Sequence, residues 1–490
     1  MHANGPHAHC CGHAHPEGIN PCHCGSPETL KAFGRISADL DRRQMLGGMA
    51  AVVGMFAGFG LAEKPAWAAP TGQAVRLTNL GYFDGVTLSI QRGRDIIIQN
   101  GRIVGLLAPG DAFEGAVLRD CGGRTVIPGL IDCHWHSTLV GVSMIAALTQ
   151  DIGFVHLMAG REAGATLRRG FTTVRDVGGP AFGLKMAIDR GAVAGPRIFP
   201  SGAMISQTSG HGDFRLLSEL PRMPGTPANQ VEQQGVALIA DGADAVLRAA
   251  REQLMKGASQ IKIMAGGGVA SLYDPLDTTQ YTEREMRAAV EAAEDWGTYV
   301  CAHVYTPGGI QRAVKAGVKS IEHGQLADEE TVRMMAGEGV WWSIQPFLAD
   351  EDSNPYSDPV QQAKQQEVAD GTVRAFELAR KHRVPMAFGT DILFNPAGTA
   401  SQGRQLAKFS RFMSPLQALH TATGAAGNLL ALSGPRAPYA MPLGVIRPGA
   451  AADLLVVNGD PAASLDFLDD PDANLMLIMK AGNVIKDQLA

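Results

Sequence analysis

The chain has 490 residues, of which 45% are hydrophobic and 18% are charged, and its formal net charge is −6. A chain of this length and composition can bury a large apolar core. The small negative net charge excludes a strongly basic surface for nucleic acid or for acidic lipid headgroups. We therefore expect a small-molecule partner, no nucleic acid and no stable membrane insertion.

The N-terminal segment, residues 1–40, is rich in histidine and cysteine. Six of the fourteen histidines and four of the seven cysteines lie within the first 24 residues. This composition is typical of a metal-binding tail. The spacing of Cys22, His23 and Cys24 is too tight for a closed zinc module. The segment is either a tail that acquires metal or an artefact of the choice of start codon, and the sequence favours neither. We do not expect the active site there.

Residues 41–69 have the parts of an export signal. Arg42 and Arg43 precede an apolar run from Leu46 to Leu61, and Ala66–Ala68 has the small-x-small pattern of a cleavage site. The run is too short and too rich in glycine for a membrane span. The paired arginines resemble a twin-arginine signal, which exports folded proteins. This predicts a periplasmic or secreted protein; a chance arginine pair in an N-terminal extension would leave it cytoplasmic.

Both ends of the remaining chain have a β-like texture. Residues 70–127 contain short segments such as Asp95–Gln99 and Arg102–Leu107, separated by turns that contain glycine. Residues 436–490 repeat the pattern in Ala452–Val457 and Leu475–Lys480. We predict one small β-sandwich built from both chain ends, with residues 128–435 inserted as a second domain.

The middle of the chain alternates apolar runs with helical patterns such as Glu283–Trp296 and Asp328–Gly337. Continuous apolar strands that alternate with helices are typical of a parallel sheet. Eight such units favour a closed (β/α)8 TIM barrel over an open sheet. The eight predicted strands are Val126–Cys133, Thr172–Asp176, Arg197–Ser201, Gln260–Met264, Tyr299–Ala302, Lys319–Glu322, Val340–Ile344 and Pro385–Gly389.

Metal-capable side chains recur at the carboxyl ends of these runs, where barrel enzymes place their functional groups. His134 and His136 are separated by one residue, so both imidazoles of an extended segment point to one side and can bind one ion. Each candidate alone would more often be structural, but six at one end of a barrel predict a metal centre. The six are His134, His136, Lys262, His303, His323 and Asp391.

Lys262 lies between apolar residues in a predicted buried strand. Such a lysine normally pairs with a carboxylate or has a lowered pKa. An uncharged lysine can also react with carbon dioxide to form a carbamate, which replaces a cation by a carboxylate able to bridge two metals. A lone buried lysine would ordinarily be interpreted as ion-paired or snorkelling. Here the five other candidate ligands favour a carboxylated Lys262 that bridges two metals.

Several motifs resemble the amidohydrolase superfamily, and the resemblance covers nearly the whole chain after residue 69. The motifs are Pro128–His136, the strand lysine Lys262, the Ile-Glu-His-Gly turn at Ile321–Gly324, the Gly-Thr-Asp of Gly389–Asp391, and Leu443–Leu454. Lys262 together with Ser206–Asp213 makes the chain similar to the prolidase/carboxypeptidase-like branch, which includes ochratoxin-hydrolysing amidohydrolases. The resemblance also implies a homo-oligomer.

The resemblance implies two divalent metal ions. His134, His136 and Asp391 would bind the first and His303 and His323 the second, with N6-carboxylated Lys262 as the bridge. Histidine, carboxylate and carbamate ligands suit zinc, although related ions would fit. Two cations about 3.5–4 Å apart can share a water and lower its pKa toward about 7, which supplies hydroxide at neutral pH.

The implied reaction is hydrolysis of an amide bond that releases an amino acid. Asp391 would accept a proton from the attacking water and deliver it to the leaving amine. His211 and Tyr305 are candidates for stabilising the oxyanion or orienting the substrate. Dipeptides and N-acyl amino acids are the expected substrates, with ochratoxin A within the range, and we expect residues 272–281 and 347–369 to shape the pocket.

Two other functions are open at this point. A cyclic-amide hydrolase or deaminase of the imidazolonepropionase kind is one, although Lys262 argues against it because the single-metal deaminase pattern lacks a bridging lysine. The other is a non-catalytic periplasmic metal-binding protein, suggested by the His/Cys-rich tail. Glu322 is expected to orient a metal-binding imidazole or to pair locally, with Arg175 and Asp176 behind the site.

Overall fold

A computed structural model of the protein describes residues 72–489 with the exception of residues 224 and 272. The predicted tail, residues 1–40, and the predicted signal segment, residues 41–69, lie outside the described residues. In the part that the structure describes, no helix is both long enough and apolar enough to cross a membrane.

Two parallel sheets form the centre of the fold. The first has the strand order β10-β9-β8, and the second has the order β12-β11-β13-β14-β15-β16-β17. Their strands are β8 (Leu130–Trp135), β9 (Phe171–Asp176), β10 (Arg197–Pro200), β11 (Met204–Ser206), β12 (Ala237–Ile239), β13 (Ile261–Met264), β14 (Val300–Val304), β15 (Ser320–His323), β16 (Trp341–Ile344) and β17 (Met386–Phe388).

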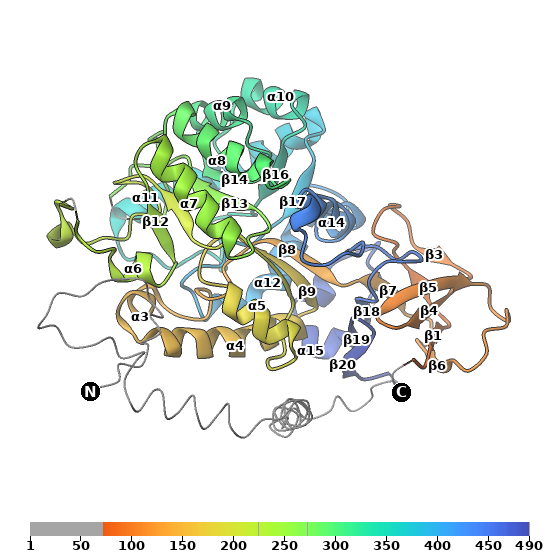
Figure 1. Cartoon of the computed structure of the whole chain (residues 1–490). Helices are drawn as coiled ribbons and strands as arrows, with labels where there is room; N and C mark the ends of the chain where they lie inside the picture. The colour runs from red at the N-terminus through yellow and green to blue at the C-terminus, as the bar shows by residue number, and fades with distance from the viewer. Residues whose placement is uncertain (1–71, 224, 272, 490) are drawn as a thin grey trace, which may run out of the picture. The chain divides into compact units, whose positions relative to one another are not determined.

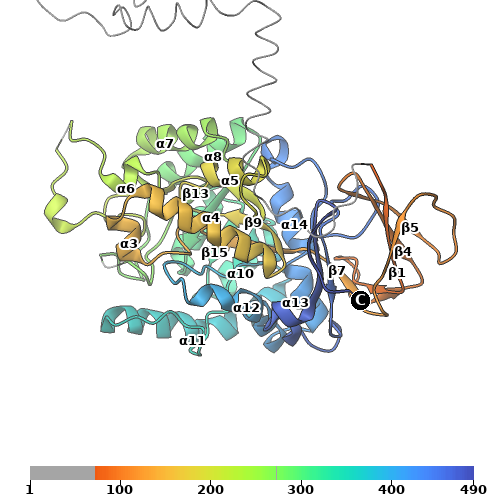
Figure 2. The same ribbon diagram turned by 90° about the horizontal axis from the view of Figure 1, so that it is seen from below.

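Helices alternate with these strands and lie on both sides of them (Figure 2). They are α3 (Met144–Thr149), α4 (Ile152–Arg168), α5 (Phe182–Asp189), α6 (Gln230–Gln233), α7 (Ala243–Met255), α8 (Glu283–Asp295), α9 (Pro307–Ala316), α10 (Glu329–Gly337), α11 (Pro359–His382), α12 (Gln402–Lys408), α13 (Pro415–Thr421) and α14 (Gly424–Ala431). One more short helix, α15 (Pro471–Asn474), lies between the strands Leu454–Val457 and Leu475–Lys480. The capping box of Thr282 and Glu285 begins α8, and the Asp328 side chain caps α10. Both helices were predicted from the sequence.

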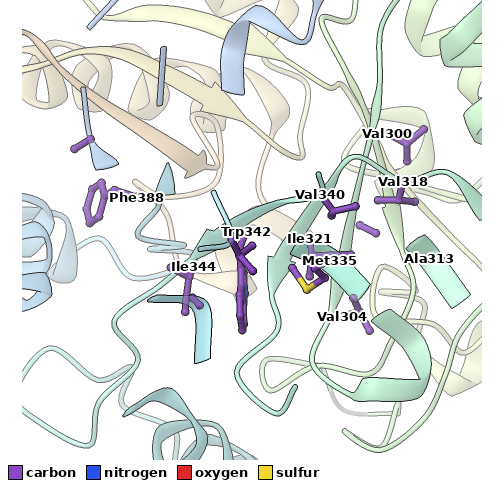
Figure 3. Close-up of a cluster of buried hydrophobic side chains, with 14 of the residues drawn as sticks. Val300, Val304, Ala313, Val318, Ile321, Met335, Val340, Trp342, Ile344 and Phe388 are labelled. Carbon is purple, nitrogen blue, oxygen red and sulfur yellow. The ribbon is translucent and has the colours of Figure 1, made fainter. Parts of the chain in front are cut away.

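The main hydrophobic core lies between the strands and the helices that cover them. Val300, Ile321, Trp342 and Phe388 come from four successive strands and are at most 1% exposed (Figure 3). Ala313 and Met335, from α9 and α10, pack into the same cluster. The alternation of strand and helix confirms the predicted α/β fold.

Strands from both chain ends meet in a separate β-rich region (Figure 1). A four-stranded sheet has the order β5-β4-β1-β6, and a six-stranded sheet has the order β20-β19-β18-β7-β2-β3. Leu77, Val126, Leu454 and Leu477 share one buried cluster. The strands are β1 (Val75–Thr78), β2 (Gly81–Tyr82), β3 (Gln91–Arg92), β4 (Asp95–Gln99), β5 (Arg102–Leu107), β6 (Val117–Asp120), β7 (Thr125–Pro128), β18 (Leu454–Val457), β19 (Leu475–Lys480) and β20 (Asn483–Asp487).

The predicted first strand, Val126–Cys133, is in fact two strands. β7 pairs antiparallel with β18 in the β-rich region, whereas β8 pairs parallel with β9. The chain passes from one to the other at Gly129, where a Cβ atom would lie 2.2 Å from the Thr172 hydroxyl oxygen. Only glycine allows this close approach, so the apolar run changes sheets there.

The predicted third strand, Arg197–Ser201, is followed by a short strand that the sequence did not indicate. β10 pairs with β9, whereas β11 pairs with β12 and β13. Gly202 separates the two with a left-handed φ of 75°. Its carbonyl accepts from the Gly179 amide at 3.1 Å, which links this bend to the loop after β9.

Candidate metal centre

Two histidines and one aspartate converge at the carboxyl end of β8. His134 and His136 are buried, with 1% and 2% of their surface exposed. Their Nε2 atoms lie 3.2 and 3.3 Å from Oδ1 of Asp391, which follows β17. Ligand atoms of all three side chains lie within 4.8 Å of one another. Two imidazole nitrogens and a carboxylate oxygen form a donor set that suits zinc.

Asp391 is held in place by its backbone as well as by its charge. Its φ is 52°, a left-handed conformation that is uncommon outside glycine, and its amide donates to the His134 carbonyl at 2.9 Å. Burial raises the pKa of Asp391, but His134 and His136 hold the pKa well below its usual range. The carboxylate is therefore available as an anionic ligand.

The second ring nitrogen of His134 faces Glu322 of β15. The Nδ1–Oε2 distance is 2.8 Å, and Glu322 also forms an ion pair with Arg175 of β9 at 2.7 Å. Burial raises the pKa of Glu322, but Arg175 and His134 more than offset this effect and keep the carboxyl ionised. Glu322 thus contacts both an imidazole and Arg175, which is consistent with either of the two tasks expected for it, to orient a metal-binding imidazole or to pair locally.

His303 and His323 lie beside this first group of ligands. The ring centroid of His323 lies 4.7 Å from that of His134 and 4.5 Å from that of His303. His323 Nδ1 pairs with the Gln345 side-chain oxygen at 2.8 Å, and His303 Nε2 pairs with the Gly267 carbonyl at 3.1 Å. Nε2 of His323 and Nδ1 of His303 are thus the nitrogens left to bind an ion.

Lys262 lies on β13, in the same pocket as these histidines. It is 1% exposed, and burial lowers the pKa of its amine. Among the described residues it has no hydrogen-bond partner. Structural lysines in the interior normally have several such partners, as Lys364 does with the carbonyls of Gly268, Ser271 and Asp274.

His211 and Tyr305 both line the pocket next to the histidines. The His211 ring stacks on His303 with centroids 4.0 Å apart, and its Nδ1 lies 2.8 Å from the Ser271 hydroxyl. Tyr305 stacks on His323 at 5.0 Å. Among the described residues no group hydrogen-bonds to the Tyr305 hydroxyl, although the hydroxyl belongs to a residue that is only 3% exposed.

The glycine-rich loop after Lys262 packs directly on His211. A Cβ atom at Gly268 would lie 2.0 Å from the His211 ring, so this position has room only for glycine. Asp274, further along the loop, reaches within 3.3 Å of His211 Nδ1. The sequence did not indicate Ser271 or Asp274 as partners of His211, because nothing in their spacing predicts which way the loop folds back.

The pocket above the polar cluster has a largely apolar wall. Its apolar lining includes Met204, Phe214, Met264, Phe347, Leu393 and Phe394. The rings of Phe214 and Phe394 meet edge to face with centroids 6.3 Å apart. Several residues of the predicted segment 347–369 line it, as expected. The described residues of 273–281 do not line it, because this loop turns toward His211 and Lys364 instead.

The α/β fold gathers imidazoles and a carboxylate at the carboxyl ends of parallel strands, where three of these side chains could hold a metal ion, and the comparison with known families shows the class of protein. Residues 125–486 match the amidohydrolase family. The chain belongs to this family and is a hydrolytic enzyme. Within it, the chain falls in the prolidase/ochratoxinase-like branch.

Individual relatives support this placement. Ochratoxinase of Aspergillus niger is 33% identical over 373 residues, which are 74% of this chain and 75% of that protein. A crystal structure of an amidohydrolase is 37% identical with a TM-score of 0.78 and covers 85% of this chain and 100% of its own. A prolidase bound to N-methylphosphonate-L-proline is 35% identical with a TM-score of 0.77 at the same coverage.

Proposed function

We propose that this chain is a binuclear metal-dependent amidohydrolase that cleaves an amide bond to release an amino acid. The convergence of His134, His136 and Asp391 carries the proposal, since their ligand atoms lie within 4.8 Å of one another. Lys262, His303 and His323 line the same pocket, so one cavity contains all six ligand candidates.

We propose that the two parallel sheets complete a (β/α)8 barrel. In this proposal β10 and β11 are two halves of the third barrel strand, bent at Gly202. The hydrogen bond from the Asp391 amide to the His134 carbonyl supports closure between β17 and β8. Residues 128–435 would form the barrel, and residues 70–127 and 436–490 the β-sandwich.

The proposed ligand set divides between two ions. His134, His136 and Asp391 would hold the first, and His303 and His323 the second, with carboxylated Lys262 between them. Zinc is the metal that the donor set favours. When bound, the two ions would lower the pKa of a shared water and polarise the amide carbonyl. The burial of Lys262, and the absence of a hydrogen-bond partner for it within residues 72–489 as far as the structure describes them, support its conversion to a carbamate.

The remaining chemistry belongs to side chains of the pocket. Asp391 would accept a proton from the attacking water and return it to the leaving amine, since it lines the pocket and its Oδ1 lies 3.2 and 3.3 Å from the Nε2 atoms of His134 and His136. The hydroxyl of Tyr305, which has no hydrogen-bond partner in the described part of the chain, would donate to the oxygen that becomes charged as the carbonyl is attacked. The unoccupied nitrogen of His211 would orient the substrate.

The relatives and the pocket wall both support a substrate class. Ochratoxinase and a prolidase are among the relatives, and N-methylphosphonate-L-proline binds to the latter. The aromatic residues Phe214, Phe347 and Phe394 favour a substrate with a large apolar group beside the scissile amide. We propose dipeptides, N-acyl amino acids and ochratoxin A as the candidates. Export to the periplasm or medium and a homo-oligomer stay predictions.

The test is metal content by mass spectrometry on the purified chain, together with hydrolysis of a panel of dipeptides, N-acyl amino acids, cyclic amides and ochratoxin A. We expect about two zinc ions per chain and cleavage of linear amides, lost on treatment with a chelator and restored by zinc. One ion with turnover of cyclic amides alone would favour the imidazolonepropionase-like alternative. Metal confined to the tail, without turnover, would favour a metal-binding protein.

A further inference from the structure

A closed hydrogen-bond network lies on the Nδ1 side of the His134 ring. Its centre is an ion pair between Arg175 of β9 and Glu322 of β15, and neither side chain has any exposed surface. Nη2 of Arg175 lies 2.7 Å from both oxygens of Glu322. His134 is the member of this trio that lines the pocket.

Arg175 uses its full hydrogen-bonding capacity inside this network. Besides its two bonds to Glu322, it donates from Nε to the Cys133 carbonyl at 2.6 Å, and from Nη1 to the hydroxyls of Tyr299 and Ser320, both at 3.2 Å. A guanidinium has five N–H donors, so none is left for a ligand. The network therefore has a supporting task and is not itself a binding site.

Glu322 determines which nitrogen of His134 carries the proton. Its Oε2 lies 2.8 Å from His134 Nδ1, and its other oxygen accepts from Ser320 at 2.6 Å. A carboxylate paired with arginine is ionised and can only accept, so Nδ1 must be the donor. Nε2 then has the free lone pair, and it faces Asp391.

The other three histidines of the centre have neutral partners. His136 Nδ1 pairs with the Gly178 carbonyl at 2.9 Å. His323 and His303 pair with an amide oxygen and a backbone carbonyl. A charge-assisted hydrogen bond is roughly twice as strong as a neutral one, and a carboxylate partner raises the basicity of the opposite nitrogen. Among these four rings, only His134 has a carboxylate as the hydrogen-bond partner of the nitrogen that would not bind an ion.

We propose that Arg175 and Glu322 are positioning residues that hold His134 in the Nδ1–H tautomer and strengthen its Nε2 as a metal ligand. Consequently, the ion held by His134, His136 and Asp391 is the more tightly bound of the two. This inference rests on the proposed function, because it requires a metal at His134.

The experiment is a zinc titration of metal-free protein against a chromophoric chelator, with no activity measurement. In Glu322→Gln the amide can donate as well as accept, so it no longer fixes the tautomer. We expect the tighter zinc affinity to fall about 10- to 100-fold, while the weaker affinity stays unchanged. Because this variant leaves the buried Arg175 charge unpaired and can fail to fold, Arg175→Met/Glu322→Gln is the second variant, with the same expected loss.

A matched control removes another buried ion pair. Arg197 and Asp453 pair at the amino end of β10, and both side chains are 5% exposed. Arg197→Met/Asp453→Asn should lower the melting temperature and leave both zinc affinities unchanged. Wild-type affinities in the Glu322 variants, or an equal loss in the control, would overturn the inference and leave the proposed function standing. A wild-type chain that binds no zinc would overturn both.

Discussion

The candidate metal ligands form two neighbouring groups, called here the two halves of the centre. The halves differ in whether their side chains make a full three-ligand set. On one side, His134, His136 and Asp391 form a three-ligand set with ligand atoms within 4.8 Å of one another. The second half contains His303 and His323, whose ring centroids lie 4.5 Å apart. Among the residues that the structure describes, no acidic side chain completes a three-ligand set on that side.

This difference gives Lys262 its importance. A protonated lysine repels a metal ion, so the half that contains His303 and His323 cannot hold a divalent cation well while Lys262 is charged. Conversion of the amine to a carbamate replaces the positive charge by a carboxylate on the same side chain. Under the proposed function, the first half would therefore bind an ion with ordinary side chains, whereas the second would depend on the modification of Lys262.

The largest effect is expected from Lys262→Ala. Loss of the bridge should remove about one of two ions and lower kcat/KM about a thousandfold, because a metal Lewis acid contributes several kcal/mol to transition-state stabilisation. Mass spectrometry gives the metal content and steady-state kinetics the rate. Added acetate should restore part of the activity, since its carboxylate can occupy the space that the carbamate leaves.

Lys364→Ala is the control for this change. Lys364 is another buried lysine, but its amine is committed to three backbone carbonyls of the loop after β13. We expect lower stability and two retained ions. If Lys262→Ala also retained two ions, the second half would be complete without Lys262, and the contrast between the halves would be wrong.

Much of the fold could be predicted because its signals are local. Apolar runs and helix caps lie within a few residues of one another, and α8 and α10 therefore have nearly the predicted bounds. The division of Val126–Cys133 into β7 and β8 could not be predicted, because β7 pairs with β18, more than 300 residues away. β11 is three residues long and has no periodicity to detect.

The convergence of the six candidate ligands in one pocket could be predicted, because parallel strands bring their carboxyl ends to one edge and the residues stand at or near those ends. Their partners could not all be predicted. Gln345, Ser271 and Asp274 contact imidazoles through side-chain directions that depend on loop paths. Glu322 was expected to pair, but its simultaneous contact with Arg175 and His134 joins three strands that are distant in sequence.

A smaller effect is expected from Tyr305→Phe, which leaves both halves of the centre intact. Removing one donor to the developing oxyanion should lower kcat/KM about a hundredfold with unchanged metal content. Tyr281→Phe is the matched control, because the Tyr281 hydroxyl is buried and donates to the Ala240 carbonyl at 2.9 Å. That change should cost about 1 kcal/mol of stability and leave kcat/KM unaltered. Unchanged kinetics in Tyr305→Phe would mean that the ring only packs against His323.

The smallest effect is expected from Gln345→Leu, which removes the neutral partner of His323. Because an amide oxygen supports the ring less than an ionised carboxylate does, the weaker zinc affinity should fall about tenfold and the tighter one should not change. Gln325→Leu is the control, since Gln325 is equally buried but donates to the Gln345 backbone carbonyl and to no histidine. The same chelator titration measures both.

The comparison with Glu322→Gln then isolates the role of charge. If the charged partner distinguishes the halves, Glu322→Gln must weaken the tighter ion more than Gln345→Leu weakens the other. Equal losses would mean that any hydrogen-bond acceptor behind the ring is sufficient. In that case the tighter binding in the first half would come from the carboxylate of Asp391, and Arg175 would serve only to neutralise Glu322 in the interior.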